Sequence, residues 1–427
     1  MKTTFSKNTS YIERNVDMKL ITKALLLLIA GVFLFTGCSI KKTSVSEKSD
    51  ANAESENQSF GKIGVALDVA DSAYYWKFTS DDFEDFGMFY SMVPQSENSA
   101  VQLVEYKNGI EKVLAETETA GKIVVTDKKI YYNDNGVIMG INRDASGKEA
   151  IIDGYICAVS EDGKYIFYYP ENPRLTAHND IYSLSLETYE SVLLANSSTL
   201  VGIRGETVFY TPDYVYSENA AEMSFFLCSS SPDGKDKCVI YESDTRYSSY
   251  FPKVAHIRFT DEYVYFSYGS VAGSAAVYQG GYTVRVKFDG TDAEILSENI
   301  GNAISTPMFE VNADGSITNR FVREIDEAYF TFRETHYKDQ NGNLVWFDNV
   351  SGAPTEICPC FTDESYDIST PDEVLVNVTD KYAFFITHHG FYDSENCIGW
   401  RDAYTREKSV FYMVDRETKE VVTSYEF

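Results

Sequence analysis

Residues 257–266 read IRFTDEYVYF, which is an alternating apolar run, a Thr-Asp turn, and an aliphatic residue followed by two aromatic residues. The last element of this pattern is one aliphatic or small residue before two aromatics, and we identify seven copies of it as a repeat. The copies are Met88-Phe89-Tyr90, Ile130-Tyr131-Tyr132, Ile166-Phe167-Tyr168, Val208-Phe209-Tyr210, Val264-Tyr265-Phe266, Ala328-Tyr329-Phe330 and Ala383-Phe384-Phe385. Their first aromatics are 42, 36, 42, 56, 64 and 55 residues apart, which indicates a repeated structural unit.

Each copy is flanked by signals of short antiparallel strands. An alternating run precedes the copy, as at 123–126, and a second alternating run follows it, as at 137–141. Turn pairs typical of hairpins close such runs, namely Asn108-Gly109, Asp233-Gly234 and Asp289-Gly290. A propeller blade consists of four such strands. The sequence therefore predicts an all-β fold, with a single β-propeller of seven four-stranded blades over residues 60–427.

The aromatic pairs are expected to lie on the second strand of each blade. There they would fill the space between neighbouring blades, because Tyr and Phe combine bulk with a preference for strands. A carbohydrate-stacking platform is the alternative, but a platform would not need seven matched copies. Residues 61–67 lie outside the copies, and we expect them to add an outer strand to the blade that ends at Phe427.

The first 59 residues carry signals of export. Residues 24–37 hold no charge and follow Lys19 and Lys23. A run of 14 residues is shorter than the ~20 that a membrane-spanning helix needs, and it suits the ~7–15 residues of a signal-peptide core. We predict a signal peptide over residues 1–37, with Met18 as the true start. An uncleaved anchor helix is the alternative.

A lipid anchor is predicted at the end of this segment. Phe35-Thr36-Gly37-Cys38 resembles a bacterial lipobox, which implies that Cys38 becomes a diacylated N-terminus. Residues 38–59 are rich in Ser, Glu, Lys and Asn, and we expect the part after Cys38 to be a disordered tether. The expected location is the extracellular face of the bacterial membrane.

The net charge excludes two classes of partner for the folded region. The whole chain has a formal charge of −28, and residues 60–427 carry 29 basic and 59 acidic side chains. Nucleic-acid binding depends on Lys and Arg, so no nucleic-acid partner is expected. The same charge would repel the domain from anionic lipid headgroups.

The sequence predicts no catalytic, cofactor-binding or metal-binding residues. The five histidines are His178, His256, His336, His388 and His389. His256 falls in an alternating run typical of a strand, and His388-His389 is expected in a loop. Residues 339–343 suit a hairpin turn better than a calcium loop. Among the cysteines, Cys228 and Cys238 flank the turn at 232–234, and we predict a cross-strand disulfide between them.

The segment Tyr282-Thr283-Val284-Arg285-Val286-Lys287-Phe288-Asp289-Gly290-Thr291 carries a resemblance to a known family. It resembles bacterial propellers related to the six-bladed repeats of low-density-lipoprotein receptors, a family of unknown function common on lipoproteins of clostridial-type bacteria. The resemblance covers most of residues 84–427, with interruptions at 300–320 and 361–372. It implies a propeller fold and a surface location, and it implies no catalytic residues.

Three functions are compatible with these observations. The favoured one is a membrane-anchored binding module for a protein, peptide or glycan. The second is a scaffold for the assembly of envelope proteins. The third is a hydrolase or lyase with its site at the mouth of the propeller channel, although a propeller fold alone does not argue for an enzyme.

Overall fold

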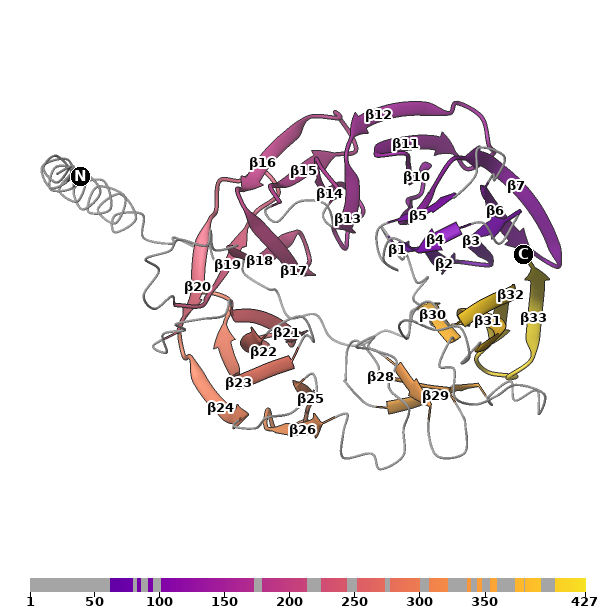
Figure 1. Ribbon diagram of the computed structural model, residues 1–427. Helices are drawn as coiled ribbons and strands as arrows, with labels where there is room; N and C mark the ends of the chain where they lie inside the picture. Colours follow the sequence, from indigo (N-terminus) through magenta and orange to yellow (C-terminus); the bar gives the residue numbers. More distant parts are fainter. Residues whose placement is uncertain are drawn as a thin grey trace, which may run out of the picture. The chain divides into compact units, whose positions relative to one another are not determined.

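The computed structural model describes residues 62–79, 83–85, 91–94, 101–172, 179–212, 224–243, 252–272, 277–299, 307–321, 336–338, 344–347, 354–358, 373–379, 381–392 and 404–427. Contacts divide the chain into Met1–Glu54 and Ser55–Phe427, and all described residues belong to the second unit. Every regular element among them is a strand (Figure 1). This confirms the predicted all-β class.

Six sheets each contain four antiparallel strands that follow one another in chain order, and in the first of them β4 (Phe83–Asp85) and β5 (Ser91–Pro94) are inserted between the second and third strands. The first three sheets are β2 (Ala66–Val69), β3 (Ser72–Phe78), β6 (Val101–Lys107), β7 (Ile110–Thr117); β9 (Ile123–Val125), β10 (Lys129–Asp134), β11 (Val137–Asn142), β12 (Glu149–Asp153); and β13 (Tyr155–Val159), β14 (Tyr165–Tyr169), β15 (Ile181–Ser185), β16 (Ser191–Ala195). The other three are β17 (Ser198–Arg204), β18 (Thr207–Pro212), β19 (Phe226–Ser230), β20 (Cys238–Glu242); β21 (Pro252–Phe259), β22 (Tyr263–Ala272), β23 (Val277–Lys287), β24 (Glu294–Asn299); and β30 (Glu373–Val378), β31 (Tyr382–Tyr392), β32 (Tyr404–Asp415), β33 (Val421–Glu426).

Nine further strands complete the described fold. A small sheet consists of β4 (Phe83–Asp85), β5 (Ser91–Pro94) and β8 (Ala120–Gly121), while β1 (Lys62–Gly64) pairs with β9. Between the fifth and the last four-stranded sheet lie β25 (Pro307–Val311), β26 (Ile317–Phe321), β27 (His336–Lys338), β28 (Leu344–Phe347) and β29 (Pro354–Cys358). These five strands form a pair and a three-stranded sheet. The total of seven blades therefore stays a prediction.

The sheets pack side by side in chain order, as a propeller requires. Consecutive first strands contact each other, as β13 contacts β17 and β17 contacts β21, and β2 contacts β30 of the last sheet. Fourth strands instead carry exposed apolar side chains such as Ile110, Val239 and Ile295. The first strands are thus interior, the fourth strands are peripheral, and the last sheet packs on the first.

The repeated aromatic pair joins each blade to both of its neighbours. Successive side chains of a strand point to opposite faces, so the two aromatics of one copy contact different sheets. Tyr131 packs with Ile156 of the following sheet. Tyr132 instead contacts Trp76 of the preceding sheet, with 6.0 Å between the ring centres. Phe209 likewise packs on Phe259, in the sheet after its own. The predicted place of the pattern on second strands is confirmed for the copies in β10, β14, β18, β22 and β31.

The structure reveals a copy that the sequence comparison missed. Ala73-Tyr74-Tyr75 lies on β3, the second strand of the first sheet, and Tyr74 and Tyr75 are fully buried. The two predicted copies at 88–90 and 328–330 lie outside the described residues. The signal for the first blade was therefore present at 73–75 in the same small-aromatic-aromatic form.

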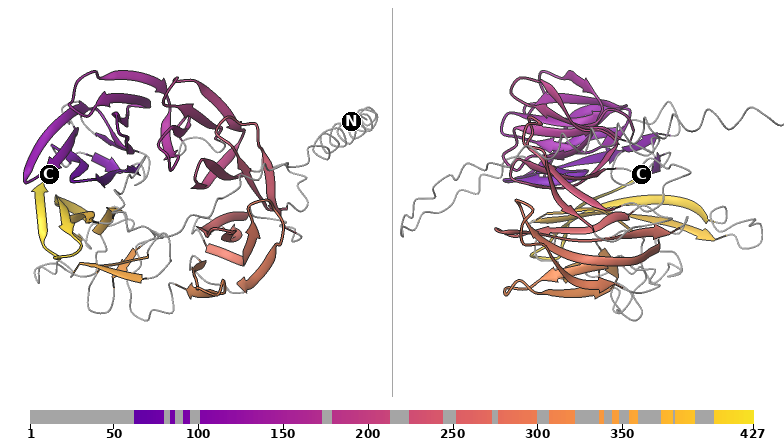
Figure 2. Two further views of the ribbon diagram at one scale, coloured as in Figure 1. Left: turned by 180° about the vertical axis from the view of Figure 1, so that it is seen from behind. Right: turned by 90° about the vertical axis from the view of Figure 1, so that its left-hand side faces the viewer.

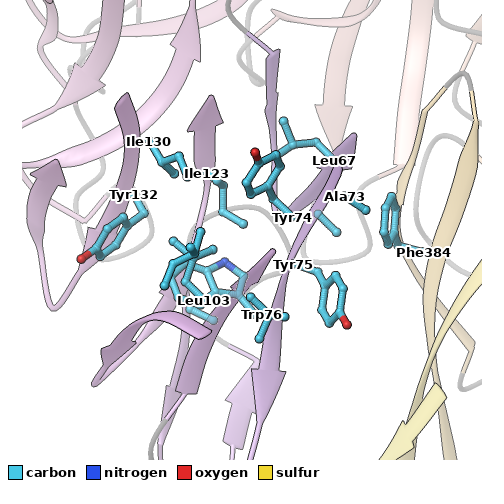
Figure 3. Close-up of a cluster of buried hydrophobic side chains, with 14 of the residues drawn as sticks. Leu67, Ala73, Tyr74, Tyr75, Trp76, Leu103, Ile123, Ile130, Tyr132 and Phe384 are labelled. Carbon is cyan, nitrogen blue, oxygen red and sulfur yellow. The ribbon is translucent and has the colours of Figure 1, made fainter. Parts of the chain in front are cut away.

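The expected role of residues 61–67 is wrong. Residues 62–64 pair with β9, and β2 pairs with β3, so neither strand extends the sheet that ends at β33. Ala66 and Leu67 are buried, which explains why this segment forms a first strand and not a peripheral one. The last sheet is built from residues 373–426 alone. Figure 3 shows Phe384 of β31 beside Ala73 and Tyr75 of β3, where the last and first sheets meet.

Candidate binding face

The two ends of the sheets are connected very differently. At one end, here called the turn end, the first strand joins the second and the third joins the fourth through short segments, such as 126–128, 205–206 and 108–109. At the other end, called the loop end, the connections include the much longer segments 79–100, 170–180, 213–225 and 393–403. These longer connections therefore leave their sheets at the same end.

The turn end is held together by contacts within and between turns. Thr126 accepts a hydrogen bond from the Lys129 amide at 3.1 Å, and Thr260 repeats this contact with Tyr263. Arg204, at the turn after β17, forms an ion pair with Asp261 of the next sheet at 3.2 Å. Such exposed pairs add little stability each. The Arg204–Asp261 pair joins the turns of two neighbouring sheets at this end.

The loop end carries three elements that extend beyond the blades. One is the sheet of β4, β5 and β8, which is inserted into the first blade and the connection after it. Another is the hairpin β22–β23, whose pairing continues to Ala272 and Val277, past the last partners of β21 and β24. The third is β31–β32, paired as far as Tyr392 and Tyr404, while β33 reaches only Val410. Figure 2 shows this yellow hairpin projecting from its sheet.

Lys122 ties two blades together at the loop end. It lies between β8 and β9, and its Nζ donates to the Cys157 carbonyl oxygen on β13 at 2.7 Å. Burial lowers the pKa of this amine. The Cys157 thiol donates to the Phe167 carbonyl oxygen at 3.0 Å, and burial raises its pKa to about 12. A thiol that stays protonated is a poor nucleophile, so this pair serves packing.

His256 lies in β21, which confirms the strand expected there. Its ring meets Phe309 of β25 edge to face at 4.9 Å. Burial, and then the charge of Arg258, lower the pKa of His256 to about 3. The imidazole is therefore neutral at physiological pH, and it is too weak a base to assist proton transfer there.

The other predicted site residues are distributed over the molecule. Cys228 and Cys238 lie on adjacent strands, with Cys228 registered against Val239 and Cys238 against Ser229, so they are offset by one position. Both are thiols in the structure, and burial, assisted by Cys238, raises the pKa of Cys228 to about 12. Their disulfide stays a prediction. His336 lies in β27, while His178, Cys38 and residues 339–343 fall outside the described residues.

The expected loop at His388-His389 is wrong. Both residues lie within β31, registered against Ser409 and Lys408 of β32. The strand continues because β32 pairs with β31 along its whole length, through a bulge between His389 and Gly390.

Neither a metal site nor a membrane-spanning helix is found in the described ranges. No three His, Cys, Asp or Glu side chains in these ranges lie close enough together to hold a metal ion. In the same part of the chain, no helix has the length and apolar character needed to cross a membrane.

Comparisons with known proteins give information on the fold alone. No model of a known protein family matches the sequence, and no curated protein matches it. Among solved structures, the chain is similar to an oligogalacturonate lyase in complex with manganese, with 9% identity over 77% of this chain and 95% of that one and a TM-score of 0.38. It is also similar to the β-propeller domain of the trilobed protease from Pyrococcus furiosus, with 10% identity over 85% of this chain and 98% of that one and a TM-score of 0.42. A third similar structure is TolB from Acinetobacter baumannii, with 12% identity over 81% of this chain and 78% of that one and a TM-score of 0.31. The strand order and packing given above carry the assignment of this chain as a β-propeller.

Proposed function

We propose that this chain is a lipid-anchored extracellular binding module that contacts a protein, peptide or glycan through its loop end. The observation that carries this proposal is the difference between the two ends. Short turns close one end, where an exposed ion pair joins Arg204 to Asp261, whereas an inserted sheet and two longer hairpins extend the other end. Binding surfaces on rigid scaffolds are commonly built from such extended connections.

The proposed anchor orients this face. Two acyl chains on Cys38 would give stable membrane attachment, where one chain would be marginal. Residues 39–59 would act as a tether, and the acidic domain from residue 60 onward would be repelled from anionic headgroups. The domain would then stand away from the membrane and present its loop end to large ligands.

Soluble protein comprising residues 60–427 tests the binding function on arrays of glycans and peptides. The proposal predicts saturable retention on one of these ligand classes. A parallel panel of glycosidase, lyase, esterase and peptidase substrates tests the enzyme alternative. Turnover of any of them, in place of simple retention, would favour a hydrolase or lyase with its site at the channel mouth.

The scaffold alternative makes a different prediction. A scaffold would be captured by crosslinking in cells together with several envelope proteins in constant proportions. A binding module would yield one ligand class, whose capture is competed by the array ligand added in excess.

A further inference from the structure

The junction between the last sheet and the first differs from the other junctions in its connectivity. The sheet β2–β7 and the sheet β9–β12 are linked twice, because β1 leads into β2 and residues 118–122 lead from β7 to β9. Gly154 links β12 to β13, and residues 196–197 link β16 to β17. The sheets β30–β33 and β2–β7 share no strand, and they come from opposite ends of the described sequence. We call this junction the seam.

Stacked aromatic rings fill the seam. Tyr75 of β3 stacks on Phe411 of β32 at 5.0 Å, and Phe78 stacks on Phe427 at 4.9 Å. Tyr425 of β33 stacks on Phe411 at 4.9 Å. Ring stacking of this kind gives specific geometry as well as buried apolar area.

One hydroxyl supplies polar contacts across the seam. The Tyr425 hydroxyl donates to the Trp76 carbonyl oxygen at 2.5 Å and accepts from the Phe78 amide at 3.4 Å. β2 pairs only with residues 72–75 of β3, so these backbone groups lie beyond the end of β2. The Tyr425 ring is partly exposed, but its hydroxyl is enclosed, and burial raises the pKa of Tyr425 well above the usual value.

Charged side chains of the first sheet surround this contact. Lys77 Nζ lies 5.5 Å from the centre of the Tyr425 ring and pairs with Glu111 at 2.5 Å. The Tyr75 hydroxyl also donates to Glu111, at 2.7 Å. The Lys77 and Glu111 side chains are 33% and 29% exposed, so water can replace their ion pair when the seam separates.

We propose that the propeller opens at this seam, by release of Tyr425 and its stacked neighbours from β3, while the covalently linked junctions stay closed. Local opening of a folded protein occurs most readily in the region that the fewest contacts and chain connections hold together. Separation at the seam breaks side-chain contacts and two hydrogen bonds, but no strand pairing. Separation at Gly154 or at residues 196–197 must also stretch a short chain connection. The seam is thus a conformational device independent of which ligand the loop end binds.

Hydrogen exchange of the soluble domain, residues 60–427, tests this proposal with two matched variants. Tyr425→Phe removes the hydroxyl that bridges the seam. Tyr169→Phe is the control, because the Tyr169 hydroxyl also accepts a hydrogen bond from the next sheet, from the Leu200 amide at 3.0 Å, at a junction that residues 196–197 link covalently.

The expected result is specific to the seam. Tyr425→Phe should raise exchange about tenfold in residues 72–78 and 410–426 and leave β14 and β18 unchanged. Tyr169→Phe should affect exchange only next to Leu200. Equal acceleration of all blades by Tyr425→Phe would overturn the proposal, as would seam exchange in the unmodified protein that is slower than exchange at the β14–β17 junction.

Discussion

The Asn133 side chain holds the carbonyl oxygen of Gly154 at 2.8 Å, at the point where the chain leaves one blade for the next. The same amide accepts a hydrogen bond from the Ile156 backbone at 3.0 Å. Asn133 is 1% exposed and lies at the loop end of β10. One side chain therefore fixes the direction in which β13 begins.

Asn133→Ala should destabilise the domain by about 2–3 kcal/mol, because two buried backbone groups would lose their partner. Urea unfolding of the soluble domain measures this as a lower midpoint with an unchanged slope. Asn142→Ala is the control, since Asn142 bonds to the exposed Ser146 side chain and should cost less. Equal midpoints for the two variants would refute the role assigned to Asn133.

Gly154 itself has a conformation that other residues rarely adopt. Its φ is +147°, and an added Cβ would lie 2.5 Å from Tyr168 Cδ2 and 2.8 Å from the Tyr169 carbonyl oxygen. Gly154→Ala should therefore cost more than about 2 kcal/mol. Gly205→Ala is the matched comparison, because Gly205 has a φ of +61° but open space where a Cβ would lie. This substitution should destabilise the domain by about 1 kcal/mol. Thermal unfolding that ranks Gly205→Ala as the more damaging change would contradict the packing described here.

His256 predicts a pH dependence of stability. Its folded pKa of about 3 lies below the ordinary value of 6.5, so the unfolded state binds a proton that the folded state excludes. This contribution is fully present above pH 6.5 and is lost as the pH falls toward 3, with a slope of about 1.4 kcal/mol per pH unit. Denaturation between about pH 4 and 5.5, which lies between the two pKa values, should show this slope, and His256→Phe should reduce it. A variant with the same slope as the unmodified protein would show that other groups cause it.

The anchor proposal is tested by Cys38→Ser in the full chain. The variant should leave the membrane fraction and take up no labelled fatty acid, whereas the unmodified protein should stay in the membrane fraction and be labelled. Retention of the variant in membranes, combined with no lipid labelling of the unmodified chain, would indicate an uncleaved helix at residues 24–37.

The sequence predicted the blade plan because its signals are local. The aromatic pair needs only strand alternation to reach two neighbours, and the turn pairs need only their own backbone: Asn108 and Gly109 both have positive φ, as their hairpin requires. The role of β1 and β2 could not be predicted in this way, because it depends on which distant strand residues 62–69 meet. The length of β31 likewise depends on β32, and the contact of Tyr425 with Trp76 joins residues 349 positions apart.

The candidate binding face was likewise predictable only in its local features. Long connections are visible in the spacing of the repeats, but the sequence does not show that they lie on one end. That placement follows from the antiparallel order of every sheet. No strand is shared across the seam, because β1 pairs with β9 and not with β33. The sequence alone does not show this pairing.

Ligand contact at the loop end can be tested by crosslinking in the lipidated protein on intact cells. A photo-reactive benzoylphenylalanine is placed at one of two exposed glutamates of the same blade. Glu171 follows β14 at the loop end, and Glu187 lies in the turn between β15 and β16 at the turn end. Glu171→benzoylphenylalanine should form crosslinks that an excess of the array-identified ligand removes, and Glu187→benzoylphenylalanine should form none. Competable crosslinks from position 187 and none from position 171 would contradict the account.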